Sequence, residues 1–181
     1  MSYPEKLSIA IYGNPILQTR AKEISKATAA HDVLAKLMFE LMYASHGVGL
    51  AAPQVGISER IIVLDGSCVA PTATPKALIN PEILKRSGRH LAVEGCLSLP
   101  GLEGEVPRAW KIRVRAIQVG AGPVEFQTQG FEARIIQHEV DHLDGVLFID
   151  RLPWLKRRML KRQLQRQLAH AEPEKTSRHA L

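Results

Sequence analysis

The spacing of apolar residues predicts two helices in the body of the chain. From Asp32 to Met42, apolar side chains recur three and four positions apart, which places them on one face of a helix. Asp32 stands where a capping side chain is expected, and the helix should end before Gly47. Residues 131–143 repeat the helical pattern, with Gly145 in the C-terminal cap position. We therefore expect an N-terminal helix and a second helix late in the chain.

Strand patterns occupy the region between these helices. Residues 60–64 and 77–79 are short apolar runs, and residues 111–119 alternate between polar and apolar positions, as in a sheet with one wet face. Residues 124–128 follow a glycine-rich turn and are the predicted hairpin partner, whereas residues 66–75 predict a surface loop. Strands and helices do not alternate regularly. The pattern therefore predicts an α+β fold with mixed, mainly antiparallel sheets rather than a doubly wound sheet.

A third helix is predicted over residues 154–170. Its expected apolar stripe consists of Leu155, Met159, Leu160, Leu164 and Leu168, with basic residues on the other face. Residues 151–181 contain nine Lys/Arg against two Asp/Glu, a charge of +7, whereas residues 1–150 contain fifteen against sixteen, or −1. The net charge of +6 therefore comes from a basic C-terminal helix and tail, and not from the body of the protein.

Length and composition narrow the class of protein. With 181 residues, 45% of them hydrophobic, the chain is expected to form one compact domain over residues 1–181. The start lacks a signal-peptide pattern and no apolar run approaches the ~20 residues that span a bilayer, which predicts an unexported, cytoplasmic protein without a membrane segment. Two cysteines, Cys68 and Cys96, also favour a reducing cytosol. A single disulfide between them stays open as an alternative.

The strongest local motif is His138-Glu139-Val140-Asp141-His142. Histidines four apart on a helix share one face, so both imidazoles can reach one metal ion. Glu139 is close enough to exchange a proton with a water activated by the metal, and Asp141 and Asp144 could orient the imidazoles. The alternative is an accidental pair on a solvated face. Apolar neighbours in this helix argue instead for a site against the core.

A catalytic metal usually has three protein ligands, and the chain after His142 does not fit the metzincin pattern for the third. Cys96 offers a thiolate suited to Fe(II), Co(II), Ni(II) or Zn(II), and the Leu-Ser-Leu-Pro stretch after it has extended character. Taken alone, Cys96 is more often a buried structural residue. Residues 47–54 would alone indicate a tight turn, but Gln54 at their end could donate a hydrogen bond to a developing oxyanion.

In combination, GVGLAAPQ, EGCLS and QHEVDHLDG resemble the three motifs of peptide deformylases. The resemblance covers about residues 11–150, the implied catalytic core, and is to the bacterial-like type I branch, whose cysteine motif is EGCLS. It implies removal of the N-formyl group from the formyl-methionine of new polypeptides, with release of formate. It also implies sheets packed around the central HExxH helix, flanked by an N-terminal and a C-terminal helix.

The resemblance implies a role for each matching residue. Cys96, His138 and His142 would hold one divalent metal, natively Fe2+, for which Zn2+, Ni2+ or Co2+ substitute. Glu139 would be the general base and then the general acid. The Gln54 side chain and the Leu97 backbone N–H would polarise the formyl oxygen. The residues implied in substrate binding are Gly49, Glu94 and Gly95 along the peptide backbone and Val48, Phe131 and Ile135 around the methionine side chain.

Two further residues and several alternatives complete these expectations. Glu94 matches a residue that pairs with Arg108 in the family, and Glu103 stands where some relatives have arginine, which would alter the preference for residues after methionine. An HExxH metallo-endopeptidase would need a different third ligand, and a nucleic-acid-binding protein would need interleaved aromatics, of which the tail has none beyond Trp154. The protein is expected to be a monomer. The C-terminal basic face is like the one with which bacterial deformylases dock on the ribosome, but a merely solvated cationic helix stays open.

Overall fold

The computed structural model describes residues 3–71 and 73–171. Its helices are α1 (Ala29–Ala44), α2 (Gly130–Leu143) and α3 (Trp154–Ala171), with short 3-10 turns η1 (Pro15–Gln18), η2 (Ala52–Val55) and η3 (Phe148–Arg151). One sheet has the order β1-β2-β3-β6-β7, formed by Gly49–Ala51, Ile61–Leu64, Lys76–Ser87, Lys111–Gln118 and Gly122–Gln129. A second pairs β4 (His90–Gly95) with β5 (Glu103–Arg108).

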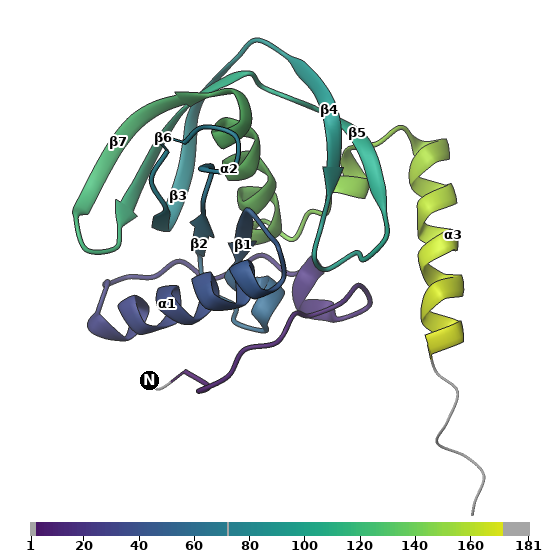
Figure 1. Cartoon of the computed structure of the whole chain (residues 1–181), viewed down its shortest axis with the longest axis horizontal. Helices are drawn as coiled ribbons and strands as arrows, with labels where there is room; N and C mark the ends of the chain where they lie inside the picture. The colour runs from purple at the N-terminus through teal and green to yellow at the C-terminus, as the bar shows by residue number, and fades with distance from the viewer. Residues whose placement is uncertain (1–2, 72, 172–181) are drawn as a thin grey trace, which may run out of the picture.

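Every strand ladder among the described residues is antiparallel, and the expected α+β class is confirmed. Helix α2 lies between the five-stranded sheet and the β4–β5 hairpin, and α3 lies outside that hairpin (Figure 1). None of the helices in the described ranges is long and apolar enough to cross a membrane. Because α2 contains His138 and His142, the HExxH motif lies on the central helix of the fold.

Strand β2 is apolar at every position, and its packing explains this pattern. Ile61 and Val63 pack with α1, whereas Ile62 and Leu64 pack with α2. Because successive side chains of a strand point to opposite faces, a strand covered by a helix on each face loses its polar positions. The two helices predicted from the sequence thus sandwich the sheet end that carries β1 and β2.

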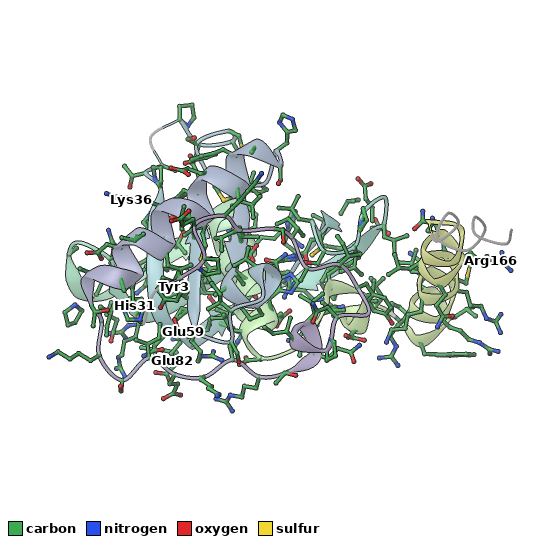
Figure 2. The ribbon with its side chains drawn as sticks, turned by 90° about the horizontal axis from the view of Figure 1, so that it is seen from below. Tyr3, His31, Lys36, Glu59, Glu82 and Arg166 are labelled. Atoms are coloured by element: carbon green, nitrogen blue, oxygen red, sulfur yellow. The ribbon has the colours of Figure 1, made fainter. Side chains whose placement is uncertain are left out.

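The N-terminal helix begins earlier than the sequence suggested. Thr28 is the N-cap in extended conformation, and its backbone N–H donates to Nδ1 of His31 at 2.9 Å. Asp32 lies in the first turn, so its predicted capping role is wrong. His31 also lies near the Tyr3–Glu59 contact, in which the Tyr3 hydroxyl donates to Oε2 of Glu59 at 2.6 Å (Figure 2). This contact ties the start of the described chain to the body.

The end of α2 agrees with the prediction. Gly145 has a φ of 72°, the Val146 N–H donates to the Asp141 carbonyl at 2.9 Å, and the Gly145 N–H donates to His142 at 3.2 Å. This pair of bonds is the glycine-terminated Schellman motif. A Cβ at position 145 would also lie 2.8 Å from the backbone of Gln18, so the close approach of η1 requires glycine a second time.

Several strand predictions were incomplete or wrong. The stretch after Cys96 is not extended, because the Leu99 N–H donates to the Cys96 carbonyl at 2.9 Å and closes a turn. Strands β1, β4 and β5 were missed, and β3 and β7 are longer than the apolar runs that predicted them. The residues of β4 and the additional residues of β3 and β7 are largely exposed or half-buried, so no repeating pattern of apolar residues marks them in the sequence. The described part of residues 66–75 is a loop, as expected.

Helix α3 contacts the body along a narrower line than predicted. Leu164 is buried and Leu160 half-buried against the cluster around Phe148. Of the predicted apolar stripe, Leu155 and Met159 are 56% and 63% exposed and do not pack against the body, and the side chain of Leu168 lies outside the described residues. The helix follows η3 at the outer side of the β4–β5 hairpin, which leaves most of its circumference uncovered (Figure 1).

Candidate metal centre and active site

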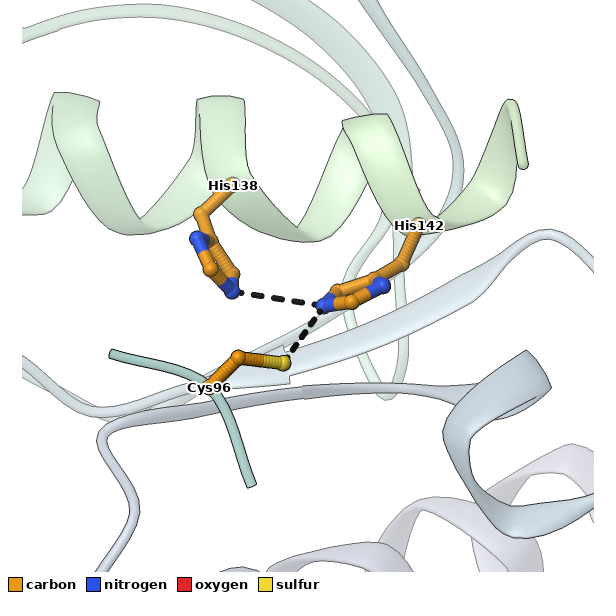
Figure 3. Close-up of side chains that lie close together, drawn as sticks. All are labelled: Cys96, His138 and His142. Atoms are coloured by element: carbon orange, nitrogen blue, oxygen red, sulfur yellow. Dashed lines mark hydrogen bonds between the residues drawn. The ribbon is translucent and has the colours of Figure 1, made fainter. Parts of the chain in front are cut away.

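The three predicted metal ligands converge. The Nε2 atoms of His138 and His142 lie 3.3 Å apart, and Cys96 Sγ lies 3.2 Å from Nε2 of His142 (Figure 3). All three donor atoms lie within 4.8 Å of one another. The histidines come from successive turns of α2, whereas the cysteine follows β4 and enters from the opposite side.

These distances fit a tetrahedral metal ion. Bonds of about 2.0 Å to nitrogen and about 2.3 Å to sulfur separate two nitrogens by about 3.3 Å and nitrogen from sulfur by about 3.5 Å. The observed separations are 3.3 Å and 3.2 Å. Two imidazoles and one thiolate form a donor set for a first-row divalent cation, and three protein donors leave room for a reactant. The site is therefore suited to a single divalent metal.

Hydrogen bonding orients the first imidazole. Nδ1 of His138 lies 3.0 Å from Oε2 of Glu94, so Nδ1–H donates to the carboxylate and Nε2 keeps its lone pair for a metal. Asp141 and Asp144 were predicted to orient the imidazoles, and this is wrong. Asp141 instead pairs with Arg108, and Asp144 accepts from Arg60 at 2.7 Å.

Electrostatics favour a cation at this point. Burial would lower the pKa of His138, but the Cys96 sulfur and the Glu94 carboxylate outweigh it and raise that pKa to about 10. Burial and the charge of His138 lower the pKa of His142 well below its usual value. The Glu94 carboxylate beside the donors thus stabilises positive charge at this point, which a bound divalent cation would supply.

Glu139 is buried beside the donors, with 3% of its surface exposed. Burial raises the pKa of its carboxyl to about 7. Among the described residues, its Oε2 atom has no hydrogen-bond partner. A carboxylate that is poised near neutral pH and has an unused oxygen beside a metal site suits proton transfer.

A buried ionic cluster supports the site. Arg108 donates to Glu94 through Nε and Nη2, each at 2.9 Å, so the expected pair is present. Arg134 donates to the same carboxylate at 2.6 Å and to the His90 carbonyl at 2.7 Å. Burial alone would raise the pKa of Glu94, but the hydrogen bonds from Arg108 and His138 lower it to about 2. Glu94 is therefore a fixed negative charge at neutral pH.

The GVGLAAPQ segment forms β1 and η2 beside the donors. Oε1 of Gln54 accepts from the Ala51 N–H at 2.8 Å, which leaves its Nε2 to donate toward Ser98 at 3.3 Å and Cys96 at 3.5 Å. A Cβ at Gly49 would overlap Oε1 of Glu139. The glycine therefore permits the closest approach of β1 to α2.

A cavity of about 600 Å3 adjoins the donors. His142 is buried and does not line it. The other predicted catalytic, substrate-binding and metal-binding residues do: Val48, Gly49, Gln54, Glu94, Gly95, Cys96, Leu97, Phe131, Ile135, His138 and Glu139. Two exposed residues, Glu103 and His46, also line it. The three motifs, far apart in sequence, thus meet around one cavity.

Arg134 and Arg151 were not predicted from the sequence to support the site, although the position of Arg134 gave an indication of its burial. Arg134 interrupts the apolar side of α2 one turn before His138, and a charged residue there requires buried partners. Arg151 is the first basic residue of the cationic C-terminal region, and nothing in its sequence neighbourhood distinguishes it from the solvated ones that follow. Its contacts with Asp141 are visible only in three dimensions.

The fold and the donor set define the class of HExxH metallohydrolases, here with a cysteine as third donor. The profile of the family described as polypeptide deformylase matches residues 6–158. The chain therefore belongs to the polypeptide deformylase family.

Individual relatives with high coverage are peptide deformylases as well. A peptide deformylase from Halothermothrix orenii is 45% identical over 146 residues, which cover 81% of this chain and 93% of that protein. The crystal structure of a peptide deformylase from Legionella pneumophila is 36% identical with a TM-score of 0.82, covering 93% of this chain and 99% of that one. One from Thermus thermophilus is 39% identical with a TM-score of 0.81, covering 91% and 98%.

Proposed function

We propose that the protein hydrolyses the formamide C–N bond of N-terminal formyl-methionine in newly synthesised polypeptides and releases formate. The observation that carries this proposal is the convergence of Cys96 Sγ with two imidazole nitrogens beside a buried glutamate, in a chain of this family. An endopeptidase is not favoured, because the family match covers the HExxH helix and the cysteine motif together.

Cys96, His138 and His142 would hold the metal. When bound, a divalent cation there supplies Lewis acidity and lowers the pKa of a coordinated water. We assign Fe2+ as the native ion because the resemblance to type I deformylases implies it; one thiolate with two imidazoles also accepts Zn2+, Ni2+ or Co2+.

Glu139 is assigned the proton transfers. It takes a proton from the water that attacks the formyl carbon and delivers it to the amine nitrogen as the C–N bond breaks. The water oxygen stays on the formyl carbon, so formate leaves with it and with the original carbonyl oxygen, and the peptide leaves with a free amino group. A pKa of about 7 suits both halves of this exchange, because neither protonation state is strongly favoured at neutral pH.

Gln54 and Leu97 are assigned to the developing oxyanion. The contact from the Ala51 N–H to Oε1 fixes the amide orientation of Gln54, so its NH2 group points toward Ser98 and Cys96 beside the cavity. The Leu97 backbone lies next to Cys96 at the same cavity. Two donors held in place before the reaction stabilise charge that appears only in the transition state.

The substrate backbone is assigned to the space between two strand edges. β1 ends the order of the larger sheet, and β4 forms one edge of the smaller one. Gly49 on β1 and Glu94–Gly95 on β4 would hydrogen-bond an inserted peptide, a contact that is independent of its side chains. Val48, Phe131 and Ile135 would surround the methionine side chain. This arrangement suits an enzyme that must accept many different N-terminal sequences.

Formate release from formyl-Met-Ala-Ser tests the proposal. Anaerobically purified protein with a quantified metal content should release formate, and Glu139→Ala should keep the metal and lose turnover. Substantial turnover by Glu139→Ala would refute its role in proton transfer. Cleavage of internal peptide bonds without formate release would instead identify an endopeptidase.

We further propose that the protein is a cytoplasmic monomer whose catalytic unit is residues 11–150, and that α3 docks on the ribosome. Its basic face consists of Lys156, Arg157, Arg158, Lys161, Arg162 and Arg166. Trp154, Leu155 and Met159 are exposed on the same helix, which lies at the periphery of the molecule (Figures 1 and 2). A cationic surface with exposed apolar groups suits an RNA-rich partner.

Salt-dependent co-sedimentation with ribosomes tests this docking. Arg158→Glu/Arg162→Glu and a truncation after Pro153 should both reduce binding. Arg113→Glu/Arg115→Glu, an equal change of charge on exposed positions of β6, should not. Equal binding by all four proteins would leave α3 as a solvated helix.

A further inference from the structure

Asp141 lies between the two histidines in sequence, is buried, and contacts neither imidazole ring. Its carboxylate holds two arginines instead. Nη1 of Arg108 donates to Oδ2, whereas Arg151 donates through Nε to Oδ2 at 3.1 Å and through Nη2 to Oδ1 at 2.6 Å. Arg151 comes from η3, immediately before the C-terminal helix. The carboxylate thus joins a peripheral cation to the buried Arg108.

Arg108 is shared between two carboxylates. Its Nη1 serves Asp141, and its Nε and Nη2 serve Glu94. Oε2 of Glu94, which receives Nη2 at 2.9 Å, is also the oxygen that lies 3.0 Å from Nδ1 of His138. A continuous series of ionic contacts therefore runs from Arg151 through Asp141, Arg108 and Glu94 to the imidazole.

We infer that Arg151 is a positioning residue for the metal centre, acting on His138 through this series of contacts. The inference rests on the proposed metal site. Without Arg151, Oδ1 of Asp141 loses the hydrogen bond from Nη2 of Arg151, and the buried carboxylate keeps Arg108 as its remaining partner. Arg108 is then drawn toward Asp141, because an under-compensated buried charge is costly.

The consequence falls on one oxygen of Glu94. Arg134 holds Oε1 at 2.6 Å, so that end of the carboxylate stays fixed. Oε2 is held by Nη2 of Arg108 and by His138. A shift of Arg108 therefore frees the oxygen that sets the orientation and tautomer of the ligand ring. Groups that orient a metal-bound histidine typically change metal affinity by about 10- to 100-fold when removed.

Because the Arg151 side chain is partly exposed, its effect on the metal centre can be tested without disturbing the packing of the core. Its side chain is 49% exposed, so replacing it with an uncharged residue of similar length leaves no internal cavity. Arg115 is a matched control, because its side chain is 60% exposed and pairs with Glu125 on the outer hairpin β6–β7. Both substitutions remove one arginine from an ion pair, and only one of these pairs leads to His138.

The experiment uses full-length protein loaded with Co2+. The rate of Co2+ loss to a chelator and the visible absorption of the bound ion are measured for wild type, Arg151→Met, Arg151→Lys and Arg115→Met. Arg151→Met should lose Co2+ about tenfold faster with an altered spectrum. Arg151→Lys should fall between it and wild type, because lysine keeps the charge and lacks the two-pronged contact. Arg115→Met should match wild type.

Each alternative outcome has a distinct meaning. If Arg151→Met has a lower melting temperature but an unchanged rate of Co2+ loss and an unchanged spectrum, Arg151 is merely structural and the inference is overturned. Arg151→Lys provides the same comparison should the methionine variant not fold. Wild-type protein that fails to retain Co2+ would overturn the proposed metal centre, and this role with it. Wild type that binds Co2+ but releases no formate would overturn the proposed reaction and leave the role of Arg151 standing.

Discussion

Gly49→Ala is the substitution whose effect the structure defines most sharply. A Cβ at this position would lie 2.7 Å from Cγ2 of Ile135 and 3.0 Å from Cδ of Glu139, in addition to overlapping the Glu139 carboxylate oxygen. Ordinary contacts of a Cβ begin at 3.4 Å, so the shortfall against Ile135 is 0.7 Å. Ile135 is β-branched and buried, and Glu139 is also buried, so neither side chain moves away freely.

The magnitude follows from the cost of overpacking. Inserting one methyl group into a filled core costs about 1–3 kcal/mol. For a chain of this size that corresponds to a melting temperature lower by roughly 2–12 °C. The larger effect falls on catalysis, because a displacement of about 1 Å in a reacting group costs roughly 100-fold in rate. The metal should stay bound, since the three atoms nearest to the added methyl group belong to Ile135 and Glu139 and not to a metal ligand.

The assay combines thermal unfolding, metal content and steady-state formate release from formyl-Met-Ala-Ser. Gly66→Ala is the matched control, because within the part of the chain that the structure describes a Cβ there meets only Cβ of Ala73, at 3.6 Å, an ordinary contact. A Gly49→Ala enzyme with wild-type turnover would show that β1 and Glu139 do not meet as closely as described. Loss of metal with loss of turnover would show that the damage spreads beyond the carboxylate.

Three further predictions follow from the same geometry. Cys96→Ala should lose tight metal binding, and unchanged metal content would place the third ligand elsewhere. Glu94 has a pKa of about 2 in the folded protein against an ordinary 4.5, so its contribution to stability is complete above pH 4.5 and is lost as pH falls toward 2. Urea unfolding of metal-free protein should therefore show about 2 kcal/mol of acid sensitivity between pH 6 and pH 3 that is missing in Glu94→Gln. Gly145→Ala should lower the free energy of unfolding by at least ~1 kcal/mol, because it combines a positive φ with a 2.8 Å approach to Gln18, and an unchanged urea midpoint would contradict this.

The sequence alone determined the features that depend on neighbouring residues. The period of residues 131–143 and the glycine at 145 predicted α2, and helical geometry then brings His138 and His142 together without help from the rest of the fold. The order and spacing of the three motifs predicted the family to which the chain belongs. The helix prediction holds because helix period and capping are local properties, and the family prediction holds because the motifs and their order can be read from the sequence without the fold.

Only the tertiary structure decided what lies between distant segments. Cys96 reaches the histidines through a turn that sequence reasoning took for extended chain, and the β4–β5 hairpin before and after it has no clear apolar period. From the sequence, Asp141 was expected to orient the imidazoles. It pairs instead with Arg108 and Arg151, because β5 and η3 bring these arginines next to it in the folded protein. Which buried charges pair is decided by contacts between segments that are distant in the sequence. Such contacts involve single residues and therefore produce no repeating pattern that could be recognised in the sequence.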